Sequence, residues 1–243
     1  MIQFLGDIHP ANLEPTVILN HDHPIIRVLV VQLNHSCSEL SSRAFVQTAH
    51  RDIQNSVRPI YTINELQPAS VTLERKQGSC SQRIAALEAI SRAHGIPTRV
   101  RGLWVDGRFW YPRFGVIRYL IPKRILVAWP QFYLEDPSGS HWVDFDDLFV
   151  SVSNLVDQTK GGFTNTGETL FEAIEHTLVD FLGKSKNCKA GCNVSSLDLS
   201  KYVLADEGFF DTRDDLFARC CLLQETLRGR AFEFFYGGRA TRR

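Results

Sequence analysis

One segment, SCSQRIAALEAISRAHGIP at positions 79–97, constrains the fold more than any other part of the chain. Isoleucine and leucine recur every three residues between positions 84 and 90, with alanines among them, and this spacing predicts a helix with a buried face. Gly95 supplies a stop signal, and Pro97 cannot continue a helix because it lacks the backbone N–H. We therefore predict a long helix that starts at Cys80, directly after a turn at Gln77 and Gly78.

The sequence around this helix changes from helical spacing to strand spacing and back. Helices are predicted over 41–57 and 69–76, followed by strands over 98–105, 108–115, 124–134 and 141–149. Two further helices are predicted, over 170–182 and over 211–227. The first of these follows a capping pair at Asn165 and Glu168. Helices, then strands, then helices predict an α+β fold, with helices packed on an antiparallel sheet. We expect a core with N-terminal helices over residues 1–150, and a helical C-terminal extension over 151–243 packed on the same domain.

Composition excludes several classes of partner. Lys+Arg and Asp+Glu both number 27, so no broad field gathers nucleic acid or an anionic membrane surface, and neither partner is expected. The longest apolar run, Pro24 to Leu33, is interrupted by Arg27 and is shorter than the roughly 18 residues of a membrane helix. The start MIQFLGDIHP lacks the pattern of a secretory signal, which predicts a cytoplasmic protein with reduced thiols.

No metal or cofactor is expected from the motifs. The pairs Cys188/Cys192 and Cys220/Cys221 do not have the spacing of a zinc site, and the histidines of NHDHP have no obvious third ligand nearby. Apolar packing of the second cysteine pair and a polar turn before Pro24 explain these residues more simply.

Cys80 is the residue whose position predicts chemistry. A helix N-terminus stabilises negative charge and lowers the pKa of a thiol, the Cys80 N–H could donate to an oxyanion, and Gly78 would let a substrate approach the backbone. A lone cysteine in this place is more commonly a buried structural residue. The wider sequence around it decides between these interpretations.

The run QGSCSQRIAALEAISRAHGIPTRVRG resembles the cysteine segment of the transglutaminase-like superfamily, and HGIPTRV is its most specific piece. IPKRILVAWPQFYL and HWVDFDDLF are similar to the two catalytic strands of that family, which has a papain-like core, so that the resemblance covers about residues 41–149. It implies that Cys80 is the nucleophile and Asp146 the aspartate that orients a histidine. It also implies a substrate or oxyanion role for five further residues: Gln77, Gly78, Trp129, Gln131 and Asp144.

The catalytic histidine of the family is missing from its expected position, which holds Val127, and Gln131 replaces the glutamate that often follows. His141 should face away from Asp146, because side chains alternate along a strand, and His94 should lie about two helical turns or more from Cys80. No other histidine lies between these two, so a shifted alignment does not supply one.

Three functions stay open. The first is Cys80-dependent acyl or aminoacyl transfer, forming or cleaving an amide or thioester on a small molecule or peptide. A reactive thioester donor on a carrier protein or coenzyme A would suit it, because the donor thiol leaves readily. The second is a non-catalytic transglutaminase-like protein that binds a ligand in the same cleft. The third is an enzyme of altered, non-acyl chemistry.

Overall fold

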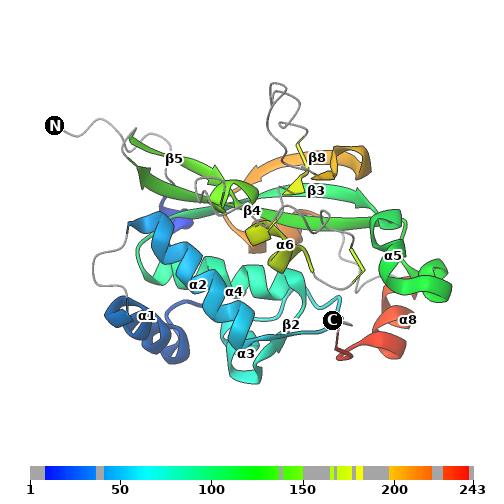
Figure 1. Cartoon of the computed structure of the whole chain (residues 1–243), viewed down its shortest axis with the longest axis horizontal. Helices are drawn as coiled ribbons and strands as arrows, with labels where there is room; N and C mark the ends of the chain where they lie inside the picture. The colour runs from blue at the N-terminus through cyan, green and yellow to red at the C-terminus, as the bar shows by residue number, and fades with distance from the viewer. Residues whose placement is uncertain are drawn as a thin grey trace.

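The computed structural model describes residues 9–36, 41–136, 139–149, 165–166, 169–176, 179–182, 197–220 and 227–240. It confirms the α+β class: helices cover one face of a curled, four-stranded antiparallel sheet of order β5-β4-β3-β8 (Figure 1). The strands are β3 (Thr98–Asp106), β4 (Arg124–Asp136), β5 (Gly139–Asp144) and β8 (Val203–Phe210). None of the described helices is both long and apolar enough to cross a membrane.

The helices beneath the sheet follow the predicted boundaries closely. They are α2 (Ser42–Ser56), α3 (Ala69–Arg75) and α4 (Cys80–Ala93), and Figure 1 shows α2 and α4 lying against the sheet. Ser41 caps α2 by accepting a hydrogen bond from the Ala44 N–H. Helix α4 ends at Gly95, whose φ of +93° few other residues adopt. The apolar run at Pro24 is a further helix, α1 (Pro24–Ser36), which periodicity did not predict.

The predicted strand over 108–115 is wrong. These residues form the 3-10 turn η2 (Gly107–Trp110) and the short helix α5 (Tyr111–Phe114), followed by η3 (Gly115–Leu120). The Asp106 carboxylate accepts a hydrogen bond from the Arg108 N–H and so caps the turn, and Pro112 favours the first turn of a helix. Aromatic residues, which strand propensity favours, here pack between elements instead.

The segment after residue 150 also differs from the expected helical extension, because it contributes β8, an edge strand paired with β3. The predicted helix over 170–182 is shorter, α6 (Leu170–His176), and is followed by the short strand β6 (Val179–Asp180) paired with β7 (Leu197–Asp198). The helix predicted over 211–227 is α7 (Arg213–Arg219), ending where Cys220 turns extended. A separate helix, α8 (Leu227–Tyr236), follows, and residues 221–226 lie outside the described part.

Helix α7 packs on the sheet against both β3 and β8. Leu216 of α7 is fully buried, and a β-carbon added to Gly102 of β3 would lie 2.6 Å from its Cδ1 atom. A larger residue at this position would therefore force the buried Leu216 side chain to move. Leu216 and Phe217 of α7 are thus part of the main hydrophobic core.

Candidate active site

Cys80 is the first residue of α4, and its position is fixed by the cap in front of it. The Ser79 hydroxyl accepts a hydrogen bond from the Gln82 N–H, and the Gln82 side chain accepts one from the Ser79 N–H. This reciprocal capping box defines where the helix begins. Cys80 is half-buried and lines a cavity of about 160 Å³.

The cavity lies where several elements meet, and most of its lining is apolar. Its walls come from the chain after β1 (Arg58–Pro59), the start of α4, α5, strand β4 and α8. The polar side chains on the walls are few: Thr62, Glu65, Ser79, Ser81, Arg113, Asn165 and Thr169. Such a cavity, apolar with a few convergent polar groups, is typical of a small-molecule site.

The electrostatics of Cys80 contradict the expected lowering of its pKa. Burial raises the pKa of the thiol to about 12, and the Glu172 carboxylate acts in the same direction. The charge of Arg83, a backbone hydrogen bond from Phe171 and the charge of Arg113 oppose this rise. Loss of water around the sulfur outweighs the favourable helix terminus, so the resting residue is a neutral thiol.

An ion pair lies next to the thiol. Arg83, one turn along α4, is fully buried and pairs with Glu172 of α6, whose other oxygen accepts hydrogen bonds from Thr169. The Arg83 guanidinium also lies 4.3 Å from the centre of the Phe171 ring. Two of its nitrogens, Nε and Nη2, have no hydrogen-bond partner among the described residues. The two charges of this pair act on the pKa of Cys80 in opposite directions, since Glu172 raises it and Arg83 lowers it.

The position expected for a catalytic histidine is apolar. Val127 of β4 lines the cavity together with Trp129, and no histidine side chain that the structure describes is on its walls. The buried His50 of α2 hydrogen-bonds the Phe171 carbonyl at 2.6 Å, and burial lowers its pKa to about 4. Its other nitrogen, Nδ1, has no partner among the described residues.

The two histidines that the sequence offered as substitutes are engaged elsewhere. His94 stacks on Phe45 with ring centres 3.6 Å apart. His141 is exposed, and its Nε2 atom lies 3.5 Å from an Asp136 carboxylate oxygen. Among the described residues, no histidine thus lines the cavity that contains Cys80.

Asp146 lies outside the strand on which it was expected. Strand β5 ends at Asp144, and Asp146 belongs to the 3-10 turn η4 (Phe145–Phe149). Its Oδ1 atom accepts a hydrogen bond from Trp129 Nε1 at 3.1 Å, and burial, with the charge of Asp147, raises its pKa to about 7. Asp146 does not line the cavity, but its hydrogen-bond partner Trp129 does.

The remaining residues implied by the resemblance do not gather around Cys80. Gln131 donates a hydrogen bond to Asp144 at 2.7 Å within the β4–β5 pair, away from the cavity lining. Gln77 accepts one from Arg58 at 2.9 Å and lines a different, polar hollow. A β-carbon on Gly78 would lie 2.7 Å from the Thr72 methyl group, so this glycine serves close packing.

The structure adds an acidic residue that sequence patterns missed. Glu65 lines the cavity, and it accepts a hydrogen bond from Ser81, the residue after Cys80. Burial raises the pKa of Glu65, while the Ser81 hydrogen bond and the charge of Arg213 lower it. No periodicity or motif marks Glu65, because it lies in a loop and reaches the site only through the fold.

A buried chain of contacts continues from Glu65 into the core. Arg213 of α7 donates to the Ser81 hydroxyl at 3.2 Å and to Glu88 at 2.6 Å, and both its charged group and that of Glu88 are almost fully buried. On another wall, Arg113 donates to Asn165 at 2.8 Å. Within the described ranges, no group of three or more His, Cys, Asp or Glu side chains is arranged to hold a metal.

Comparison with known proteins agrees with the resemblance over the core. Residues 34–147 match the family model of the transglutaminase-like superfamily. Among solved structures, a chain from Cytophaga hutchinsonii described as a "Putative Cysteine Protease" is similar, with a TM-score of 0.42 and 22% sequence identity. That alignment covers 59% of this chain and 42% of the other, so it spans less than half of the other chain. A search of curated protein sequences found no match.

Proposed function

We propose that the transglutaminase-like domain at residues 34–147 carries out acyl transfer through Cys80, with an activated thioester as the acyl donor. The observation that supports this proposal is the position of Cys80, at the capped start of α4 and on the wall of a mostly apolar cavity. The donor would be an acyl group on a carrier protein, on coenzyme A or on a similar thiol. The acceptor would be an amine or water.

The neutral state of the thiol requires a group that accepts its proton. Glu65 is the one acidic side chain on the described cavity walls, and burial raises its pKa towards the range in which a general base is efficient. In the first step, Cys80 Sγ bonds to the thioester carbon while its proton passes to the Glu65 carboxylate, directly or through a water molecule. The donor C–S bond then breaks, and the departing thiolate takes this proton.

The second step returns the enzyme to its starting state. The amine or water attacks the carbonyl carbon of the acyl-Cys80 thioester and gives a proton to Glu65. The bond between that carbon and Sγ breaks, and the sulfur recovers the proton as a thiol. Thioesters suit this site because their leaving group needs little assistance, whereas an amide would depend on a strong acid and base pair.

A second candidate function is ligand binding without chemistry. It is favoured by the raised pKa of Cys80 and by the apolar Val127 in the histidine position. In that case the cavity would retain its ligand, and Cys80 would contribute only to the lining.

Intact mass after incubation with acyl thioesters of N-acetylcysteamine separates the two. We expect one acyl group per chain, mapped to Cys80, and its loss in Cys80→Ala. Cys220→Ala is the matched control, because Cys220 is also half-buried but lies outside the cavity. An adduct that persists in Cys80→Ala, or none with any thioester, would exclude transfer through this residue.

A further inference from the structure

The cavity lies between two clusters of buried apolar residues, and Trp110 packs against both of them. On one side is the main core, represented on the wall by Ile84, Leu126, Trp129 and Leu170, with Cys80 and Val127 packed against it. On the other side is a small cluster of four buried residues, Ile63, Phe114, Ile121 and Phe232, called here the Phe232 cluster. All four line the cavity. The Phe232 cluster is a satellite of the main core, as is usual for a domain, and the cavity lies between the two.

The Phe232 cluster is held in place by the C-terminal helix. Glu233, next to Phe232 on α8, accepts hydrogen bonds from the Thr62 hydroxyl at 2.8 Å and from the Ile63 N–H at 2.9 Å. The Phe232 ring meets the Phe114 ring edge to face, with centres 5.4 Å apart. Helix α8 is therefore fastened to the chain after β1 and forms a fixed wall.

Three polar residues of the cavity, Ser79, Ser81 and Glu65, are at the Cys80 side of this arrangement. Ser79 and Ser81 flank Cys80 in the chain, and Glu65 is bonded to Ser81. On the other side, Thr62 and Arg113 adjoin the Phe232 cluster, and their side chains are hydrogen-bonded to Glu233 and Asn165. A bound molecule would thus have its polar, reacting end at the sulfur and an apolar end towards the Phe232 cluster. A charged or strongly polar group at the apolar end would lose its hydration without a partner.

The volume sets the size of the apolar end. An engineered apolar cavity of about 150 Å³ lined by similar side chains binds benzene. The cavity beside Cys80 has about 160 Å³. It therefore has room for one ring or for a chain of about six carbons.

We infer that the cavity selects an uncharged apolar acyl group of this size, such as hexanoyl or phenylacetyl, and that Phe232 sets the limit on its length. This inference rests on the proposed function for the acyl chemistry, but the ligand class follows from the cavity itself. Each methylene that enters an apolar site increases affinity about fourfold. Preference should therefore rise from acetyl to hexanoyl and fall for decanoyl.

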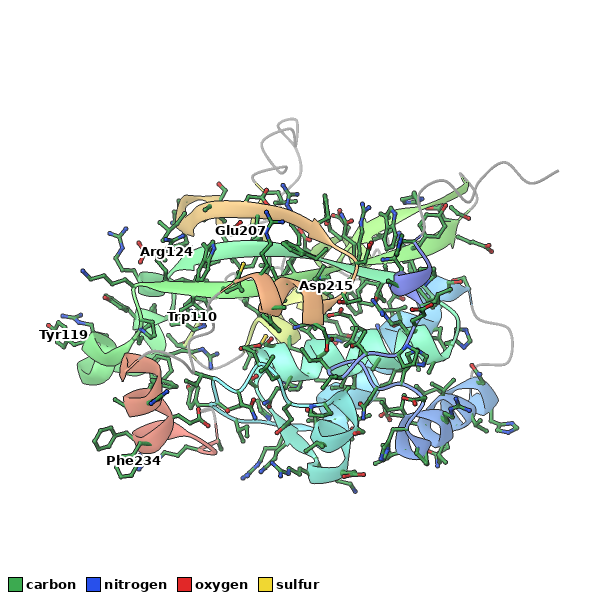
Figure 2. The ribbon with its side chains drawn as sticks, turned by 180° about the vertical axis from the view of Figure 1, so that it is seen from behind. Trp110, Tyr119, Arg124, Glu207, Asp215 and Phe234 are labelled. Atoms are coloured by element: carbon green, nitrogen blue, oxygen red, sulfur yellow. The ribbon has the colours of Figure 1, made fainter. Side chains whose placement is uncertain are left out.

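The chain offers a matched control on the same helix. Phe234 lies two residues after Phe232 but is 84% exposed. Figure 2 shows it extending outward from α8 into solvent. Phe232→Ala should move the preferred thioester of N-acetylcysteamine from hexanoyl to decanoyl, whereas Phe234→Ala should leave the preference unchanged. Phe232→Leu, which keeps an apolar side chain, provides a milder version if the alanine variant does not fold.

Binding to Cys80→Ala, measured by calorimetry with hexanamide, phenylacetamide and the charged succinamate, separates the ligand class from the chemistry. Selective binding of the two neutral amides without any adduct on the wild-type chain would support this inference and refute acyl transfer. An adduct whose yield does not depend on chain length, or equal effects of Phe232→Ala and Phe234→Ala, would refute the inference and leave the transfer reaction standing. Equal binding of succinamate would overturn the apolar assignment.

Discussion

The neutral state of Cys80 predicts slow alkylation, and its cause can be tested by removing one carboxylate. A rise in the thiol pKa from 9.0 to about 12 lowers the thiolate fraction at neutral pH about 10³-fold. The more basic thiolate is also more nucleophilic, and a Brønsted coefficient of about 0.4–0.5 recovers roughly 20-fold. We therefore expect Cys80 to react with iodoacetamide about 50-fold more slowly than an ordinary thiol.

Glu172→Gln should make Cys80 more reactive. The Glu172 carboxylate raises the pKa of the thiol, and in its absence the buried charge of Arg83 would be left to stabilise the thiolate. Each unit by which the pKa falls should increase the alkylation rate about three- to fourfold at neutral pH. The variant should also be less stable, by about 3–5 kcal/mol, since it leaves Arg83 unpaired.

Rates are measured at each cysteine by iodoacetamide labelling and peptide mapping, from neutral to alkaline pH. Cys220 is the internal reference, because Glu207 and Arg219, and not Glu172, are the charges that influence its pKa. The Glu172→Gln rates at Cys220 should match those of the wild type while the chain remains folded. Labelling of wild-type Cys80 as fast as an unstructured thiol, or a slower reaction in Glu172→Gln, would refute this account of the site.

Two further predictions concern carboxyl groups. Glu65→Gln should lower the rate of acyl-Cys80 formation about 10²- to 10⁴-fold and remove the acid limb of its pH profile. In the wild type we expect the midpoint of this limb above the ordinary pKa of glutamate. Glu74→Gln, at a half-exposed residue outside the cavity, is the control, and an unchanged rate in Glu65→Gln would exclude Glu65 as the base. Burial raises the pKa of Asp146 to about 7, so the folded state is favoured when this carboxyl group is protonated. The stability that it provides below about pH 4 is therefore lost as the pH rises through 7. Asp146→Asn keeps an acceptor for Trp129. Chemical denaturation should show this variant gaining up to about 4 kcal/mol relative to wild type between acid and mildly alkaline pH. A difference that is constant with pH would show that folding does not change the pKa of Asp146.

The sequence by itself determined the elements whose signals are local. The start of α4 is fixed by Ser79 and Gln82, three residues apart, and its end by Gly95 and Pro97. Strands β3 and β4 follow from their composition, and the missing histidine is visible as Val127. In each of these cases the deciding groups lie within a few positions of one another, so a pattern along the chain contains the physical cause.

Only the tertiary structure decided the chemistry around Cys80. The helix terminus predicted a lowered pKa, but desolvation by elements far along the chain raises it, and no local pattern reports burial. Glu65 and Phe232 are separated from Cys80 by 15 and 152 positions in the printed numbering, yet they line the same cavity. Likewise, β8 pairs with β3 across about a hundred residues. Burial and the enclosure of a cavity depend on which distant surfaces meet, and this is settled by packing of the whole chain.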